Sequence, residues 1–183
     1  MADQYLFLLA EINQTSANAV MGHLIGLVPQ PPDRLIVAIN SPGGSVVSGI
    51  ALYNSMRSMP YPIITHNIGN VDSIANVIYL AGSERYSCPA STFMFHGVGF
   101  NGNANERLEE NNLKAKLDTI LADHKRISAI ISDRTGGSLN VRQGMSLFKE
   151  QRTRDAQWAL SKNIATGVRE FVLPANANVQ FLA

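Results

Sequence analysis

The stretch Ile39-Asn40-Ser41-Pro42-Gly43-Gly44-Ser45-Val46 decides the fold of this chain. It starts at the end of a short apolar run, residues 35–40, whose β-branched side chains predict a buried strand. Pro42, Gly43 and Gly44 end that strand in a tight turn and leave backbone N–H groups free to face a ligand. A helical pattern of apolar residues follows at once, over residues 45–58. The stretch therefore predicts a strand, a glycine-rich turn and a helix in direct succession.

A second segment, Gly69-Asn70-Val71-Asp72-Ser73-Ile74-Ala75, repeats this plan. A strand is expected over residues 62–68, a Gly/Asn turn after it, and a helix over 73–82 that Ser73 opens. Two strand–turn–helix units can aim a serine hydroxyl and several backbone N–H groups at one point. That geometry suits the stabilisation of an oxyanion.

Strands and helices alternate along the rest of the chain. Further strands are expected at 5–9, 85–88 and 92–95, further helices after Asn13 and over 139–149 and 155–165, and an additional edge strand at 169–173. Such alternation predicts βαβ units, and hence an α/β fold with a mainly parallel sheet covered by helices. With 183 residues, the chain is expected to form one domain.

Residues 104–134 form an unusually long helical pattern, which follows a Gly/Asn loop at 97–103. Its apolar residues recur mostly at spacings of three and four, among them Leu113, Leu117, Leu121, Ile127 and Ile131. One small globule cannot easily cover so long a stripe, so we expect an arm that packs on its counterpart in another subunit. The composition, 45% hydrophobic and 16% charged, favours an oligomer for the same reason.

The charge balance and the single cysteine exclude several classes of protein. Fifteen basic and fourteen acidic residues give a formal charge of +1, without the basic stripe typical of nucleic-acid binding. Cys88 cannot form an internal disulfide, which suits a reducing compartment. No signal-peptide pattern is present, and no apolar run approaches the roughly 20 residues of a spanning helix. We therefore expect a cytoplasmic protein that binds no nucleic acid, membrane, metal or cofactor.

Ser73 and His96 are the candidates for catalysis, because each follows a predicted strand. In open α/β sheets the carboxyl ends of the strands line the ligand crevice. A serine hydroxyl beside a neutral histidine is the arrangement for nucleophilic catalysis. The structural alternatives are that Ser73 is only a helix N-cap and that Gly43 and Gly44 are only turn residues. Packing roles are the simpler expectation for the other histidines, His23, His66 and His124.

These motifs resemble those of the ClpP-type serine peptidases. Residues 39–46 resemble the Asn-Ser-Pro-Gly-Gly signature of that family, residues 69–75 its nucleophile segment, and Met94-Phe95-His96 its Met-x-His strand, in the family's order and spacing. The long arm resembles the handle helix, and Thr135-Gly136 its usual terminator. The resemblance spans roughly residues 5–168. It implies a ClpP/crotonase-like fold of repeated β-β-α units, with a head at about 1–100 and 136–183 and a protruding handle at about 101–135.

The resemblance also implies a self-compartmentalising serine endopeptidase. Ser73 would attack the scissile carbonyl, and His96 would take its proton and later protonate the leaving amine. The backbone N–H groups of Gly44 and Ile74 would hold the oxyanion. In the family, two stacked rings interlock through the handle helices and enclose the active sites. Copies of the chain would then be the partners, and a peptide or an unfolded protein the substrate.

Several departures from the family pattern leave alternatives open. Gln151 stands at the position of the third catalytic residue, an Asp in the family, and it can orient His96 but cannot stabilise an imidazolium. Glu150 or Asp155 could supply a carboxylate instead. We expect the segment that forms the family's axial pore loops to be largely missing before Gln4, which would affect docking to an unfoldase ATPase. The loop after His96 lacks the family's Gln-Pro-Leu-Gly-Gly pattern, so peptide binding by strand pairing could differ.

Asp72, immediately before Ser73, is another departure. If its side chain faces the site, its negative charge would oppose alkoxide formation.

Two other functions compete with the active peptidase. One is a non-catalytic ClpP-like subunit, which the missing carboxylate favours. The other is a crotonase-type acyl-CoA enzyme, in which the glycine-rich turns would hold a thioester oxyanion.

Overall fold

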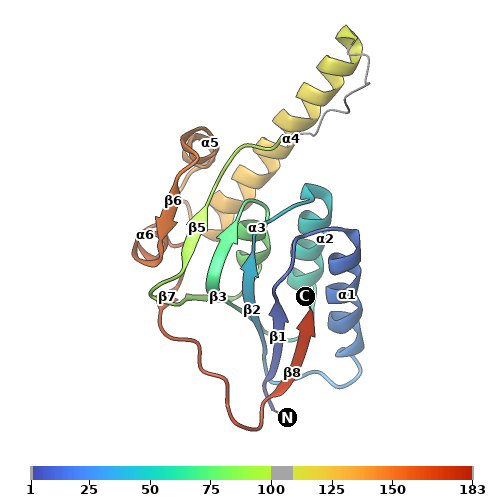
Figure 1. The fold of residues 1–183 in the computed structure, drawn as a ribbon, viewed down its shortest axis with the longest axis vertical. Coiled ribbons are helices and arrows are strands. Elements are labelled where there is room, and N and C mark those ends of the chain that lie inside the picture. Colours follow the sequence, from blue (N-terminus) through green and yellow to red (C-terminus); the bar gives the residue numbers. More distant parts are fainter. Residues whose placement is uncertain (1, 100–108, 183) are drawn as a thin grey trace.

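The computed structural model describes residues 2–99 and 109–182. Its strands are β1 (Gln4–Leu8), β2 (Leu35–Ser41), β3 (Ile63–Asp72), β4 (Glu84–Ser87), β5 (Thr92–Met94), β6 (Thr153–Asp155), β7 (Gly167–Val168) and β8 (Asn178–Leu182). Its helices are α1 (Gln14–Gly26), α2 (Val46–Arg57), α3 (Ala75–Tyr79), α4 (Glu110–Arg134), α5 (Val141–Glu150) and α6 (Ala156–Ser161). Figure 1 shows a twisted sheet flanked by α1, α2 and α3, with α4 projecting away from it. The predicted α/β fold with a mainly parallel sheet is confirmed.

Within the described residues the strands form one sheet, ordered β6-β5-β3-β2-β1-β8, to which β4 and β7 are joined beside β3. The pairs are parallel except for β5 and β6, which run antiparallel. Strand β3 serves two neighbours in turn: residues 64–67 pair with β4, and residues 70–72 pair with β5. The end of β3 and the end of β5 therefore lie side by side.

The turn predicted at Gly69 and Asn70 is wrong, because β3 continues to Asp72. The register between β2 and β3 shifts near this point, and the Asn40 side chain enters the gap. Its Oδ1 accepts a hydrogen bond from the Asn70 amide at 2.9 Å, and a Cβ at Gly69 would lie 2.5 Å from that oxygen. Gly69 and Asn70 therefore form an irregularity inside β3. There the Asn40 side chain, and not a backbone carbonyl of the neighbouring strand, accepts the hydrogen bond of the Asn70 amide.

The helix predicted from Ser73 starts two residues later. Helix α3 begins at Ala75, and its N-cap, Ile74, makes no side-chain capping bond. Ser73 has a φ of +54°, in the left-handed region, so it belongs to the turn before the helix. The expectation that Ser73 opens the helix, as N-cap or first residue, is therefore wrong.

The edge strand predicted over residues 169–173 is also wrong. The added edge strand is β8, which pairs with β1 in parallel. Phe171 instead packs edge-on against Phe7 and His66, with ring centroids 5.5 and 5.2 Å apart. Its ring belongs to a small apolar cluster around Tyr5, Ile36 and Ile64. The packing of Phe171 on this cluster covers apolar surface of the sheet. This tertiary contact decides the conformation of residues 169–173, although their local sequence pattern is that of a strand.

The two halves of α4 differ in their surroundings. Near its carboxyl end Ile127 and Ile131 are buried in the main core. Further out Leu113, Leu117 and Leu121 are 45%, 53% and 49% exposed, and Figure 1 shows this half standing clear of the sheet. Residues 104–108, where the arm was predicted to begin, lie outside the described residues, as do loop residues 100–103.

Arg85 in β4 connects the carboxyl end of α4 to the sheet by hydrogen bonds. Its side chain is 4% exposed and donates hydrogen bonds to the carbonyls of Ile164 at 2.7 Å and of Arg134 and Asn163 at 3.0 Å. Arg134 is the last residue of α4, where carbonyl groups have no partner inside the helix. Burial lowers the pKa of Arg85, with the charge of Arg134 adding to the effect.

No helix in the described ranges combines the length and apolar character that crossing a bilayer requires.

Candidate active site

Ser73 occupies a sharp turn between β3 and α3. Its amide donates to the Met94 carbonyl at 2.8 Å, and its φ of +54° is uncommon for a residue with a side chain. The buried Asn76 holds this turn, because its Nδ2 donates to the carbonyls of Ser73 at 3.0 Å and Met94 at 2.9 Å. A strained serine between a strand and a helix is typical of a nucleophile elbow.

The glycine-rich turn after β2 packs directly against this serine. A Cβ at Gly43 would lie 2.6 Å from the Ser73 Cβ and 2.7 Å from the Asp72 carbonyl oxygen. A Cβ at Gly44 would lie 2.3 Å from the Ile12 carbonyl oxygen. Both glycines have positive φ, +89° and +139°. Their role thus goes beyond a turn, since only glycine permits so close an approach.

The amides of Gly44 and Ile74 are available to a ligand. Neither donates a hydrogen bond to another described residue, whereas the amide of the adjacent Ser45 donates to Ile12 at 2.6 Å. Gly44 and Ile74 line one cavity together with Ser73 and His96. Two unpaired N–H groups beside a nucleophile suit the binding of an oxyanion.

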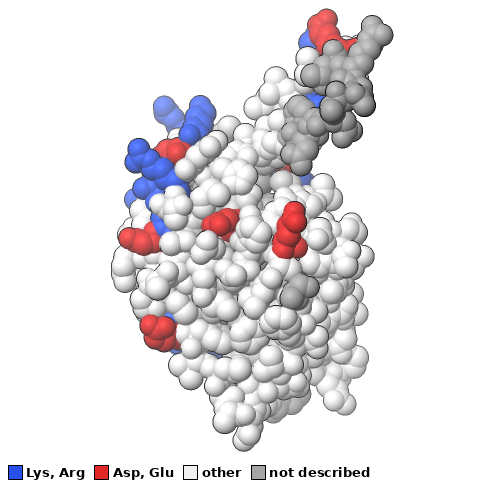
Figure 2. All heavy atoms as spheres, in the orientation of Figure 1, with Lys and Arg blue, Asp and Glu red and all other residues white. Residues whose placement is uncertain are grey.

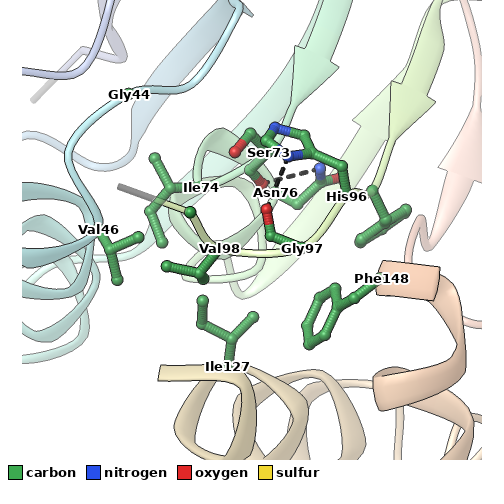
Figure 3. Close-up of a pocket in the computed structure, with 12 residues that line it drawn as sticks. Gly44, Val46, Ser73, Ile74, Asn76, His96, Gly97, Val98, Ile127 and Phe148 are labelled. Atoms are coloured by element: carbon green, nitrogen blue, oxygen red, sulfur yellow. Dashed lines mark hydrogen bonds between the residues drawn. The ribbon is translucent and has the colours of Figure 1, made fainter. Parts of the chain in front are cut away.

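His96 lies two residues past the end of β5 and lines the same cavity as Ser73 (Figure 3). Its Nδ1 is 2.9 Å from the carbonyl oxygen of Gly97. A carbonyl can only accept, so Nδ1 carries the proton and Nε2 keeps its lone pair. Within the described chain no hydrogen bond joins the Ser73 hydroxyl to this ring. Catalytic hydrogen bonds are often long in sites without substrate and tighten when it binds.

The cavity beside Ser73 has a volume of about 130 Å³ and is mainly apolar. Its apolar walls come from Val46, Ile74, Phe95, Val98, Ile127 and Phe148. Sites that enclose whole small molecules typically measure roughly 300–1,000 Å³. This cavity is therefore of a size for one apolar side chain of a larger ligand.

His124 of α4 supports the loop that follows His96. Its Nε2 accepts a hydrogen bond from the Val98 amide at 2.8 Å, and its ring stacks on Phe148 with centroids 4.9 Å apart. Burial lowers the pKa of His124, which favours the neutral, accepting ring. From the sequence we expected His124 to have a packing role. Its position in the apolar stripe of the long helix was the one sequence feature that could have indicated a contact with the site. Asn76 was missed as well, because nothing local marks its two hydrogen bonds.

Gln151 lies at the end of α5 with a φ of +49°, and its side chain is exposed. The pairing of β5 with β6 places Met94 opposite Thr153, so the same register continued outward brings Gln151 level with His96. No hydrogen bond joins these two side chains within the described chain. The assignment of Gln151 to the third catalytic position stays a prediction.

The two carboxylates near Gln151 are engaged elsewhere. Glu150 forms an ion pair with Arg154. Asp155 caps α6, its Oδ1 accepting from the Trp158 amide at 2.7 Å.

Figure 2 shows Lys and Arg side chains gathered at one corner of the molecule, over the region of α5 and β6 in Figure 1. The chain around Gln151 is indeed basic, with Lys149, Arg152 and Arg154.

His66 and Cys88 lie together at a different place. The His66 Nε2 is 3.1 Å from the Arg169 carbonyl oxygen and 3.6 Å from the Cys88 Sγ. Burial lowers the pKa of His66 to about 4. Neither residue lines the cavity of Ser73 and His96. The surroundings of His66 agree with the packing role expected from the sequence.

Comparison with known proteins identifies the class of protein. The fold is similar to that of a ClpP1 mutant from Listeria monocytogenes, with a TM-score of 0.78, 23% sequence identity and 92% of each chain covered. The ATP-dependent Clp protease proteolytic subunit 1 of Leifsonia xyli subsp. xyli is 29% identical over 178 residues, which cover 94% of this chain and 86% of that protein. Residues 1–160 match the family described as Clp protease. The chain belongs to this family and is a ClpP-like serine protease.

Proposed function

We propose that this protein is a serine endopeptidase in which Ser73 is the nucleophile and His96 the general base. The observation that carries the proposal is the turn at Ser73, strained at φ +54° and lining the same cavity as a histidine whose Nε2 is free to accept. A neutral histidine with Nδ1 protonated is the form that can take a proton from a serine hydroxyl. Gly44 and Ile74 are the proposed oxyanion donors.

The reaction proceeds in two steps, acylation of Ser73 and hydrolysis of the acyl-enzyme. The Ser73 Oγ forms a bond to the scissile carbonyl carbon while its proton moves to the His96 Nε2. The carbonyl electron pair shifts to oxygen, where the two amides stabilise the negative charge. The C–N bond then breaks, and the leaving amine takes the proton from His96. In the second step water gives a proton to the His96 Nε2 while its oxygen bonds to the acyl carbon. The ester C–O bond then breaks, the acid leaves, and the Ser73 Oγ takes the proton from His96. Loss of one oxyanion donor typically costs on the order of 10²–10³ in rate.

The apolar cavity indicates the kind of substrate. Its volume of about 130 Å³ and its walls of Val46, Ile127 and Phe148 suit an apolar side chain at the residue before the cleaved bond. Such side chains are buried in folded proteins and become accessible in peptides and unfolded chains. We therefore propose peptides and unfolded proteins as substrates.

The exposed leucines of α4 support a homo-oligomer of stacked rings. Leu113, Leu117 and Leu121 recur every four residues, so they form one apolar stripe on the outer half of the helix. We propose a head at about residues 1–100 and 136–183 and a handle at about 101–135 that packs on a second ring. The Leifsonia relative is named ATP-dependent, so an unfoldase ATPase is a proposed partner here too. The unpaired Cys88 fits a cytoplasmic location.

A fluorophosphonate probe tests the catalytic proposal. We expect the wild-type protein to form a covalent adduct, Ser73→Ala to form none, and His96→Ala to react at least a hundredfold more slowly. Cleavage of a fluorogenic peptide with an apolar residue before the scissile bond should follow the same order. Labelling that persists in Ser73→Ala would exclude Ser73 as the nucleophile.

The main alternative is a non-catalytic subunit, and the absence of a carboxylate at Gln151 favours it. An intact oligomer that neither reacts with the probe nor cleaves peptides would support this alternative. Turnover of an acyl-CoA thioester would instead support crotonase-type chemistry.

A further inference from the structure

We propose that Asp72 is a positioning residue whose negative charge acts on His96 and replaces the carboxylate that Gln151 lacks. The proposal rests on the catalytic roles proposed above for Ser73 and His96. It assigns to Asp72 an effect opposite to the one first expected from its place beside the nucleophile.

The strand register places Asp72 on the same face of the sheet as His96. Asp72 in β3 is the parallel partner of Met94 in β5, and the preceding pair, Val71 and Phe93, is fully buried on the core face. Successive side chains of a strand point to opposite faces, so Asp72 and Met94 share the other face. The alternation continues past β5, since Phe95 is buried and His96 is half-buried. His96 therefore projects from the face that carries Asp72.

The carboxylate of Asp72 is incompletely satisfied. Its Oδ1 is buried and has no hydrogen-bond partner in the described part of the chain. Burial raises the pKa of Asp72, while the Asn70 side chain, the charge of His96 and the Met94 backbone lower it. Asp72 as a whole is half-buried, and a carboxylate oxygen that is buried without a partner is costly unless a positive charge lies within reach. The imidazolium formed at His96 during the attack is such a charge.

Two groups then share the task of the missing carboxylate. In a Ser-His-Asp triad a single carboxylate both orients the imidazole and stabilises the imidazolium. Here the Gly97 carbonyl accepts from the His96 Nδ1 at 2.9 Å, which sets the tautomer and the ring orientation (Figure 3). A neutral carbonyl supplies no net charge, so the stabilisation of positive charge is left to Asp72. Asp72 can act through space, without contact with Nδ1.

The other charged groups near His96 do not fill this role equally well. Glu11 lines the outer side of the site with Ser73 and His96, but its side chain is exposed, where water weakens its charge. In residues 149–154, Glu150 is paired with Arg154, and Lys149 and Arg152 leave an excess of positive charge, which does not stabilise an imidazolium. His124 faces the loop after His96 and is neutral. Asp72 thus combines a half-buried carboxylate, whose Oδ1 is buried, with the correct face of the sheet.

The rate of fluorophosphonate labelling as a function of pH tests the proposal. Asp72→Asn keeps the shape and removes the charge, and Asp72→Glu keeps the charge. We expect Asp72→Asn to react about tenfold or more slowly near pH 7, because a nearby opposite charge changes a protonation equilibrium by at least that factor. The acidic limb of its pH profile should move to lower pH. Asp72→Glu should retain more of the rate, and the matched charge control Glu170→Gln, in the segment after β7, should be unchanged.

A rescue variant separates charge from structure. Gln151→Asp in the Asp72→Asn background should recover part of the labelling rate, because it restores a carboxylate at the position proposed for the third catalytic residue. A loss caused only by disturbed packing at Asp72 would not respond to that change. Faster labelling in Asp72→Asn would overturn the proposal and show that the charge opposes attack. An unchanged rate and pH profile would overturn it as well.

A second readout does not depend on activity. In the Ser73→Ala background, NMR of ¹³C-labelled histidine side chains follows the titration of His96. We expect its midpoint to fall by about one pH unit on Asp72→Asn, or on Asp72→Ser if the first variant does not fold. An unmoved midpoint refutes the action of Asp72 on His96, whatever the catalytic result. A moved midpoint in a protein that never reacts with the probe would refute the proposed function alone.

Discussion

The Nε2 of His124 in α4 accepts a hydrogen bond from the Val98 amide at 2.8 Å and so ties this helix to the loop that follows His96. The neighbouring Gly97 carbonyl in turn accepts from the His96 Nδ1 at 2.9 Å. Two hydrogen bonds therefore connect α4 to the proposed general base. Since the outer half of α4 is the proposed contact between rings, assembly and the orientation of His96 share one structural element.

Removal of the hydrogen-bond acceptor on His124 should slow catalysis, while the aromatic packing at this position is kept. His124→Phe retains an aromatic ring against Phe148 but leaves the Val98 amide unpaired. A hydrogen bond of this kind is worth about 1 kcal/mol net, so we expect labelling to slow about fivefold to tenfold. His124→Asn, which restores an acceptor, should be closer to wild type. Equal rates in His124→Phe and wild type would show that the loop holds His96 without α4.

Gly43→Ala should abolish labelling. The new Cβ would lie 2.6 Å from the Ser73 Cβ, at a backbone position with a φ of +89° that alanine adopts poorly. We expect at least a hundredfold loss in labelling rate and a lower melting temperature. Gly22→Ala is the matched control, because a Cβ there meets nothing within 4 Å and Gly22 lies inside α1. That variant should be neutral or slightly more stable. Normal labelling of Gly43→Ala would contradict the close approach of the two turns.

Asn76→Ala should loosen the turn at Ser73. It removes the donor to the Ser73 and Met94 carbonyls in a buried place, which typically costs about 1–3 kcal/mol. Thermal melting should show the loss of stability, and labelling should slow at least tenfold because Ser73 is no longer held. Asn18→Ala, an exposed change in α1, serves as the control. A destabilised protein with wild-type labelling would show that Asn76 does not position Ser73.

His66 should make the protein less stable in acid. Burial lowers its pKa to about 4, against 6.5 for an unperturbed histidine. Between these values the unfolded chain binds more protons than the folded one, so stability is lost as the pH falls through 6.5 toward 4. We expect a loss of about 2 kcal/mol between pH 7 and pH 5 from this residue, measured by urea unfolding. His66→Gln should show a smaller drop over the same range, and an equal drop would exclude His66 as its source.

Leu117→Glu should reduce the assembly to smaller particles. The side chain is 53% exposed in the middle of the leucine stripe, and a charge buried there between two helices would be unpaired. Light scattering should report a lower mass, with the circular dichroism of the fold retained. Thr119→Glu changes the same helix two residues away, on another face, and should leave the mass unchanged. An unaltered mass in Leu117→Glu would contradict the proposed contact between rings.

The sequence by itself determined several of the local elements and the positions of the two main candidate site residues. The apolar run at 35–40 predicts β2, and Asn13 predicts the start of α1, where its side chain accepts from the Ser16 amide at 2.9 Å. Ser73 and His96 could be chosen because each follows a strand in a mainly parallel sheet. These features depend on neighbours in the sequence, so local patterns are enough to predict them.

Only the tertiary structure decided how the site is held. β3 runs through Gly69 and Asn70 because Asn40, far away in the chain, pairs with the Asn70 amide. The register of β3 against β5 places Asp72 on the face of His96, and a one-residue shift would turn it to the opposite face. The contact of His124 with Val98 likewise joins separate elements. Such relationships arise from register and packing between distant segments, and no local period in the sequence encodes them.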